Sequence, residues 1–332
     1  MAIHVQRDAE ALLPGTAACM GAFDGLHRGH QALIERARTL GDRVALVTFD
    51  PHPARVLAPE RAPRLLQSTT QRERVAESLG VDGLVLLPFD AVMAKLPPDA
   101  FVERYITGGL RPRALVVGAD FRFGAGRAGD TEQLQRLLAP SGIELAVVEP
   151  VLGEDGGKLG STEVRKAIDA GDMPRAGAIL GRWHAVHGPV VTGHKRGRTI
   201  GYPTANIDVG EGYVPPIGIY ATVLSVWDRG SPDYGAVWPS VSSVGRNPTF
   251  TTGAAPVTVE AYVLDRDLGE RLYGVEVELS FVARLRDEET FGSVEALVAR
   301  IDRDCEEARV HLGPEALART LVPPPPQVGS PR

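Results

Sequence analysis

Two histidines, His27 and His30, lie three residues apart between an apolar run and a helical pattern. The start of a helix favours a bound phosphate through its N–H groups and dipole, and glycines at 25 and 29 let the backbone approach that phosphate. Imidazoles can donate hydrogen bonds to charge that develops on a phosphoryl group. Positioning and electrostatics carry such substitutions without a covalent nucleophile. The segment therefore favours adenylyl transfer over hydrolysis, and a plain tight strand-to-helix turn is the alternative.

A second stretch, residues 193–206, combines three glycines and three cations with a hydroxyl and an amide further on. Glycine-rich backbone can wrap a triphosphate with its N–H groups. The side-chain oxygens of Thr204 and Asn206 suit Mg²⁺, which takes few protein ligands. The nearest approach to a Walker A loop, at Gly157, has Leu152 and Leu159 at two required positions, so this is not a P-loop protein. From the loop alone, a solvated basic hairpin is an equally good interpretation.

Composition limits the class of protein that can carry these stretches. The 332 residues suffice for roughly two domains. Apolar content of 43% and charged content of 23% are ordinary for a globular protein, and a net charge of −6 argues against a nucleic-acid or anionic-membrane binder. No long apolar run and no N-terminal signal pattern is present, so we expect a cytoplasmic location. Cys19 and Cys305 have no metal-ligand spacing and are expected to be reduced core residues.

The first half of the chain alternates apolar runs with helical patterns. Helices are expected near residues 35, 75, 103, 135 and 166, between strands at 16–23, 44–49, 84–88, 114–117 and 144–148. This alternation predicts a Rossmann-like α/β domain with a parallel sheet, whose ligands bind at the carboxyl ends of the strands. The histidine segment lies at such an end, and so do 48–53 and 117–124.

After residue 181 the apolar period changes from helical to two, which indicates half-buried antiparallel strands. Runs near 184–192, 217–227, 236–244, 257–264 and 275–281 predict a small antiparallel β-barrel. A helix follows, and its apolar stripe should pack on the barrel: Val294, Leu297, Val298, Ile301, Cys305 and Ala308. We predict domains at 1–180 and 181–315 and a proline-rich disordered tail at 316–332.

In this order, over residues 16 to 312, the chain resembles the bifunctional bacterial riboflavin kinase/FAD synthetase family. The two histidines and the Pro-Thr-Ala-Asn sequence at 203–206 are its most specific motifs. Segments 48–53, 117–124, 161–165, 245–250 and 284–288 support them. The resemblance implies an N-terminal nucleotidyltransferase (FMN adenylyltransferase) domain that joins AMP from ATP to FMN, giving FAD and pyrophosphate. It implies a C-terminal barrel that phosphorylates riboflavin to FMN with Mg-ATP, and small-molecule partners without nucleic acid or membrane.

The resemblance also implies roles for single residues. His27 and His30 would stabilise charge as pyrophosphate leaves, Glu260 would take the proton from the riboflavin hydroxyl, and Thr204 and Asn206 would hold magnesium. The implied nucleotide- or phosphate-binding residues are Gly21, Phe23, Asp24, Gly29, Asp120, Ser161, Thr162 and Arg165 in the first domain, and Gly193, Lys195, Gly197, Arg198 and Gly201 in the second. Aromatic candidates for the flavin slot are Tyr202, Tyr220 and Phe250, each of which could equally belong to the core.

The chain departs from the family pattern in two places. Gly160 and Lys158 stand where the family usually has serine and a basic residue that is often arginine, and Ala22 stands where asparagine is common. Lysine keeps the charge of arginine but loses its bidentate geometry. Two alternatives to a two-activity enzyme therefore stay open: a protein in which only the kinase half is active, and a non-catalytic flavin- or nucleotide-binding regulator.

Overall fold

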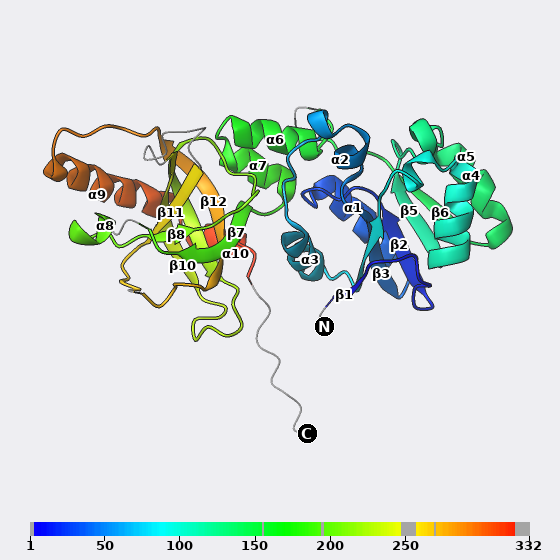
Figure 1. The fold of residues 1–332 in the computed structure, drawn as a ribbon, viewed down its shortest axis with the longest axis horizontal. Helices are drawn as coiled ribbons and strands as arrows, with labels where there is room; N and C mark the ends of the chain where they lie inside the picture. The colour runs from blue at the N-terminus through cyan, green and yellow to red at the C-terminus, as the bar shows by residue number, and fades with distance from the viewer. Residues whose placement is uncertain (1–2, 155, 194–195, 247–256, 269, 323–332) are drawn as a thin grey trace, which may run out of the picture. The chain divides into compact units, whose positions relative to one another are not determined.

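The computed structural model describes residues 3–154, 156–193, 196–246, 257–268 and 270–322. Its contacts divide the chain into two compact units. The first unit comprises residues 1–65 and 69–161, and the second comprises 66–68 and 162–332. Among the described residues, no helix is long and apolar enough to cross a membrane. Each unit is described by itself below (Figure 1).

The first unit is built on a six-stranded, all-parallel sheet in the order β1-β4-β3-β2-β5-β6. The strands are β1 (His4–Gln6), β2 (Thr16–Met20), β3 (Arg43–Asp50), β4 (Gly83–Pro88), β5 (Ala114–Gly118) and β6 (Glu144–Val148). Every residue of β2 is buried, as a parallel strand covered on both faces requires. Strands β3 and β5 lie on opposite sides of β2, so the strand order reverses there. In open parallel sheets, ligands bind at the carboxyl ends of the strands at such a point.

Helices connect these strands as the alternating pattern predicts. They are α1 (Arg28–Arg38), α2 (Pro53–Leu57), α3 (Thr69–Ser78), α4 (Pro98–Phe101) and α5 (Thr131–Leu138), with a π-helical segment at Val102–Leu110 and short 3₁₀ turns at Pro59–Arg61, Met93–Lys95, Ala125–Arg127 and Ala139–Ser141. Helix α1 starts three residues earlier than the apolar pattern suggests, so His30 lies inside its first turn. One apolar core joins the sheet to α4, α5 and the π-helical segment.

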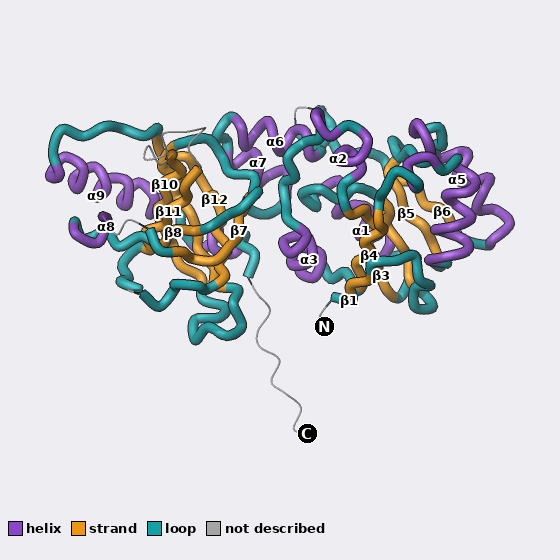
Figure 2. The backbone as a smooth tube through the Cα atoms, viewed as in Figure 1, coloured by secondary structure: helices purple, strands orange, loops and turns teal. Residues whose placement is uncertain are grey.

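The second unit contains a closed six-stranded antiparallel barrel in the order β10-β11-β8-β7-β12-β9. Its strands are drawn in orange in Figure 2. The strands are β7 (His184–Val191), β8 (Ala205–Ile207), β9 (Gly218–Val226), β10 (Val237–Arg246), β11 (Val257–Val263) and β12 (Glu276–Arg286). The unit's helices are α6 (Ser161–Asp169), α7 (Met173–Leu180), α8 (Arg196–Thr199), α9 (Val294–His311) and α10 (Pro314–Ala318). Both fold predictions, the parallel α/β sheet and the antiparallel barrel with a following helix, are confirmed.

Helix α9 packs on strands β9, β10 and β12 as expected, but its buried face differs from the predicted stripe. Cys305 and Ala308 are buried, while Val294 at the start of the helix is 55% exposed. Asp304, absent from the predicted stripe, is buried because it pairs with an arginine of β12. Both cysteines are free thiols in the core, as predicted, and burial raises the pKa of Cys305 to about 11.

The limits of the predicted domains need one correction. Residues 316–322 were expected in a disordered tail, yet the carbonyl of Ala316 accepts hydrogen bonds from the Trp183 indole at 2.8 Å and the Thr320 hydroxyl at 3.1 Å. Thr320 is buried, so the tail prediction is wrong for these residues, and 323–332 lie outside the described residues. Helix α7 packs on the barrel strands β7 and β12 and therefore belongs to the second unit. By contacts, the first unit ends at residue 161. The boundary at 180 stays a prediction.

Candidate active sites

The two histidines of the first unit lie against each other at the start of α1. His27 is the residue before the helix, with φ −69° and ψ 172°, and His30 lies one turn on. Their rings stack with centroids 3.7 Å apart, and the ring of Phe23 meets His30 edge-on at 5.1 Å. Because a side chain at Gly29 would lie 3.1 Å from the His27 ring, glycine there leaves the stack undisturbed. The structure thus places the two imidazoles side by side at the start of α1.

The loop that carries His27 has an unusual backbone. Phe23, Gly25 and Leu26 all have positive φ values, of 46°, 93° and 43°. Positive φ is uncommon outside glycine, and such strain clusters at functional sites when the surroundings hold it. Here the Ser161 hydroxyl donates to the Asp24 carbonyl at 2.7 Å, and the Thr48 hydroxyl donates to the Ala22 carbonyl at 3.0 Å. The loop that leaves β2 is thus tied to the end of β3 and to the start of α6.

The other predicted residues of this site are divided between the two units. Gly21 continues β2, where its N–H donates to the Val47 carbonyl at 3.1 Å, and Asp24 is 3% exposed. Ser161 belongs to the first unit by contacts, whereas Thr162 and Arg165 follow in α6 and belong to the second.

Asp120 follows β5, at the strand end adjacent to that of β2. The Lys158 ammonium donates to its carboxylate. This hydrogen bond is the main reason why the pKa of Asp120 lies below its usual value. Both side chains are largely exposed, at 69% for Asp120 and 49% for Lys158. The departure at Lys158 therefore places a cation at this strand end, paired with Asp120.

Sequence reasoning missed a buried cation beside the first site. Arg72 lies in α3, which follows the end of β3, and the residue is only 3% exposed. Burial lowers the pKa of Arg72, and the negative charges of Asp24 and Asp50 oppose that effect. A single arginine in a polar helix gives no sequence signal of this placement. Its charge offsets carboxylates in the two strand-end loops.

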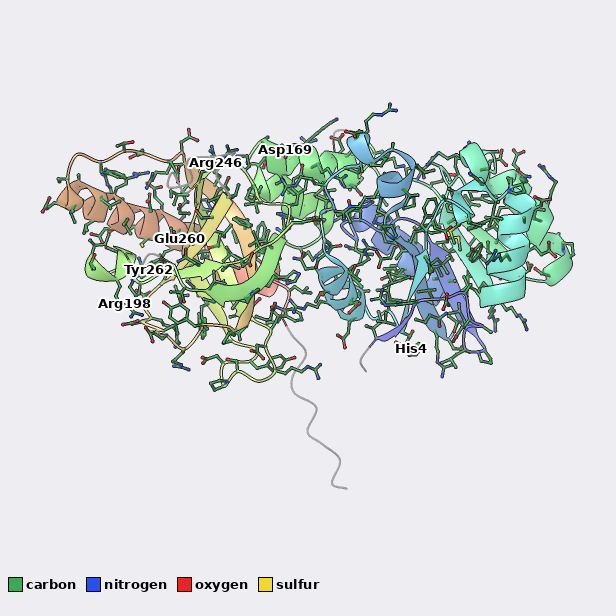
Figure 3. All side chains as sticks on the ribbon, viewed as in Figure 1. His4, Asp169, Arg198, Arg246, Glu260 and Tyr262 are labelled. Carbon is green, nitrogen blue, oxygen red and sulfur yellow. The ribbon has the colours of Figure 1, made fainter. Side chains whose placement is uncertain are left out.

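In the barrel, strand pairing brings the predicted base and the predicted metal ligands together. Glu260 of β11 lies directly opposite Asn206 of β8 (Figure 3 labels Glu260). The Thr204 hydroxyl, just before β8, donates to the Glu260 carboxylate at 3.0 Å. Val259 and Ala261 are almost fully buried, while Glu260 is half-buried on the other face. The alternation predicted for this strand thus aims Glu260 at the Thr204–Asn206 pair.

The glycine-rich stretch reaches the same place. A side chain at Gly193 would overlap the Asn206 carboxamide at 2.2 Å, and one at Gly197 would overlap the Tyr202 carbonyl at 2.2 Å. Gly201 has φ +89°, which favours glycine. Gly193, Arg198, Thr204 and Asn206 line one pocket of about 40 Å³. The stretch forms the short helix α8 rather than a simple hairpin, and Lys195 lies outside the described residues.

A larger cavity, of about 420 Å³, opens between α9 and the barrel face that carries Glu260. A volume of this size is typical of small-molecule sites. Tyr202 and Tyr262 line it, with ring centroids 5.1 Å apart. The Tyr202 hydroxyl donates to the Asp302 carboxylate of α9, which is the main cause of its raised pKa. Thr204 lines both this cavity and the smaller pocket, so it joins them.

The structure places the three aromatic candidates for the flavin slot differently. Tyr202 faces the cavity, but Tyr220 is fully buried in the core, where its hydroxyl donates to the Pro216 carbonyl at 2.6 Å and its ring packs on Phe281. The geometry thus gives no support to Tyr220 as a flavin contact. Phe250 lies outside the described residues. Tyr262 was missed, although it lies two residues after Glu260 and so on the same face of β11.

The donor set of the barrel site fits a magnesium ion. Thr204 and Asn206 offer a hydroxyl and an amide oxygen, the hard ligands that Mg²⁺ prefers. Asn206 is seated over Gly193, where any larger residue would displace it. Among the described residues, no cluster of three or more histidine, cysteine or acidic side chains could hold a metal.

Two family models match the chain, each over one of these sites. Residues 9–163 match the FAD synthetase model, and residues 180–312 match the riboflavin kinase model. The first range contains both histidines and the strand-end loops, and the second contains the whole barrel and all of α9.

Whole-chain comparisons agree. A bifunctional riboflavin kinase/FMN adenylyltransferase of Pseudomonas fluorescens is 35% identical over 306 residues, which cover 91% of this chain and 94% of that protein. The protein of the same description from Escherichia coli K12 is 33% identical over 310 residues, or 92% and 95% of the two chains. A crystal structure described as a macrolide-efflux protein from Streptococcus pneumoniae superposes with a TM-score of 0.80 at 30% identity, covering 93% of this chain and 99% of that one.

Proposed function

The chain belongs to the family of bifunctional riboflavin kinases/FMN adenylyltransferases, and we propose that its two activities are divided between the two sites described above. The barrel phosphorylates riboflavin with ATP to give FMN and ADP. The parallel-sheet unit joins the AMP part of a second ATP to FMN and releases pyrophosphate. The observation that carries this division is the pairing of Glu260 with Thr204 and Asn206 in one unit and the stacked His27 and His30 in the other.

In the barrel, we assign the cavity of about 420 Å³ to riboflavin and the adjoining smaller pocket to magnesium and the terminal phosphates of ATP. Thr204 lines both the cavity and the pocket, as expected of a residue that lies between the two substrates. Glu260 accepts the proton of the ribityl 5′-hydroxyl as its oxygen attacks the γ-phosphorus, and ADP leaves. When bound at Thr204 and Asn206, magnesium neutralises charge on the phosphates. Arg198, and Lys195 by resemblance, add positive charge on the ATP side.

In the first unit, a phosphate oxygen of FMN attacks the α-phosphorus of ATP and pyrophosphate leaves. His27 and His30 donate hydrogen bonds to the phosphate oxygens as negative charge moves to the leaving group. The N–H groups at the start of α1 bind the same charge, and the strained loop around Phe23 and Asp24 keeps both rings in place. Asp120, Ser161, Thr162 and Arg165 are proposed to contact the nucleotide. Because both reactions consume ATP, we propose that they take place in the cytoplasm, and cell fractionation would test this location.

Purified protein incubated with riboflavin, ATP and magnesium tests the proposal directly. Chromatography should show FMN first and FAD later, and omission of magnesium should stop both. FMN without FAD would leave only the kinase half active. If neither FMN nor FAD forms, the chain would be a binding protein without catalytic activity. Supplying FMN in place of riboflavin tests the first unit alone, so failure of one site is seen separately from failure of the other.

A further inference from the structure

An arginine–carboxylate pair closes one side of the larger barrel cavity. Arg286, at the end of β12, donates two parallel hydrogen bonds to Asp304 of α9, at 2.8 Å and 2.7 Å. The two side chains are 10% and 3% exposed. Paired hydrogen bonds of this kind fix orientation as well as distance. The Asp304 hydrogen bonds are the main cause of the raised pKa of Arg286.

The pair joins two pieces of chain that both form part of the cavity wall. Glu288, Glu289, Thr290 and Phe291 follow β12 and line the cavity, while Leu297, Ile301 and Asp304 line it from α9. The guanidinium of Arg286 also lies 5.9 Å from the centre of the Phe291 ring. This buried contact therefore links the end of β12 to α9 beside the cavity.

The surrounding charges make this contact hard to replace. Arg300 of α9 approaches the same Asp304 carboxylate at 3.3 Å, and Glu289 lies 3.9 Å from both arginines. Glu307 balances Arg300 from outside at 3.7 Å. Two cations thus share one buried carboxylate. Removing that carboxylate leaves uncompensated charge at the wall, which is far more costly than losing an exposed ion pair.

We propose that Arg286 and Asp304 are positioning residues for the flavin substrate: their contact holds the 287–291 loop and α9 at the separation that a flat tricyclic ring requires. The flavin ring system is rigid, so a wall that is displaced loses contact over the whole ring face at once. Neither Arg286 nor Asp304 lines the smaller pocket that contains Asn206 and that we assign to the ATP side. The pair therefore determines riboflavin affinity and leaves ATP affinity alone. The inference rests on the proposed assignment of this cavity to riboflavin.

The test measures steady-state kinase kinetics of the full chain with Asp304→Asn and Arg286→Lys. Asp304→Asn keeps the shape and removes the charge, and we expect the KM for riboflavin to rise about tenfold or more, with the KM for ATP unchanged. Arg286→Lys keeps the charge and loses the paired geometry, so its KM should lie between that of Asp304→Asn and the wild type. Glu306→Gln, an exposed carboxylate on the same helix, is the matched control and should match the wild type.

Quenching of riboflavin fluorescence on binding gives affinity without turnover and must follow the same order. Conversion of supplied FMN to FAD reports the first unit of each variant. An unchanged riboflavin KM in both variants overturns the proposal. So does an equal rise in the KM for riboflavin and the KM for ATP, because that pattern describes a general role in barrel folding. Wild-type protein that neither binds nor phosphorylates riboflavin would instead refute the proposed function.

Discussion

The two sites of this chain handle phosphorus with different chemical groups. The first offers imidazoles and backbone N–H groups around a strained loop, and among its residues we assign no proton acceptor. The second places a carboxylate, Glu260, beside a hydroxyl and an amide. The difference follows from the nucleophile. An FMN phosphate is already ionised at neutral pH and needs only charge stabilisation, whereas an alcohol must lose a proton as it attacks.

The sites also differ in how the chain assembles them. The first is largely local, because residues 21–30 carry both histidines and the loop that holds them. The second is non-local: β8, β11, β12 and α9 meet only in the folded barrel. A local site is readable as a motif, and a non-local one depends on strand register. Substitutions at each site should therefore affect one activity and spare the other.

Loss of the base should give the largest effect. Glu260→Gln keeps the side-chain shape and removes proton-accepting ability, so riboflavin phosphorylation should fall about 10²- to 10⁴-fold in kcat. The conversion of supplied FMN to FAD should stay at the wild-type rate. Chromatographic rates with riboflavin and with FMN check both statements in one preparation.

Glu315→Gln, an exposed glutamate of α10, serves as the control and should leave both rates unchanged. A Glu260→Gln protein that keeps kinase activity within a few-fold would contradict the base assignment. The comparison between an ionised and an unionised nucleophile would then lose its basis.

The mirror-image effect belongs to the histidines. His30→Ala removes one donor to the phosphates, and removing one such preorganised donor typically costs about 10²- to 10³-fold in rate. FAD formation from FMN should fall by that amount while FMN formation from riboflavin persists, so FMN accumulates. Product ratios from riboflavin and ATP measure the effect.

His4→Ala provides the matched histidine control in the same unit, because His4 is exposed on the edge strand β1 (Figure 3). A His30→Ala protein that forms FAD normally would remove the histidine pair from the reaction and leave the backbone N–H groups as the main stabilisers.

Sequence reasoning located more residues of the first candidate site than of the second, because the first is local in the sequence and the second is not. His27 and His30 fall where a strand-to-helix motif places them, and period-two alternation correctly separates Glu260 from Val259 and Ala261. Strand β1 was missed because three residues carry too little periodicity, and β8 was missed because Pro-Thr-Ala-Asn reads as a motif rather than a strand.

The walls of the larger cavity show where single-sequence reasoning stops. Tyr220 and Tyr262 are both tyrosines in strands of the barrel, yet one is core and the other faces the cavity. Asp304 breaks the apolar stripe of α9, but only the position of Arg286 across the fold explains its burial. Choosing between such residues requires the strand register and the helix rotation, which periodicity leaves undetermined.

A buried histidine gives the barrel a pH dependence of its own. His184 is fully buried, and burial lowers its pKa from 6.5 to about 4. Between these values the unfolded chain binds more protons than the folded barrel, so stability is complete above pH 6.5 and is lost as the pH falls towards 4. We expect a contribution of about 3 kcal/mol across that window. All three tryptophans lie in the second unit, so their fluorescence in urea titrations reports on the barrel.

The control for this effect is His184→Gln, which cannot protonate and can still donate to the Tyr213 carbonyl that His184 Nε2 contacts at 2.6 Å. Its free energy of unfolding should vary less between pH 6.5 and pH 4 than that of the wild type. An identical pH slope in both proteins would assign the acid sensitivity to other groups.

The smallest effect is expected at the exposed pair of Asp120 and Lys158, where the two units allow a comparison of like with like. Asp120→Asn removes a carboxylate that is 69% exposed, and such surface pairs contribute about 0–1 kcal/mol. Calorimetric stability should change by no more than that, and FAD formation by only a few-fold. Asp304→Asn removes the same group at 3% exposure and should cost far more in its own unit. A loss of FAD formation beyond about 10²-fold in Asp120→Asn would instead mean that this carboxylate positions a group that the reaction requires, such as the Lys158 ammonium.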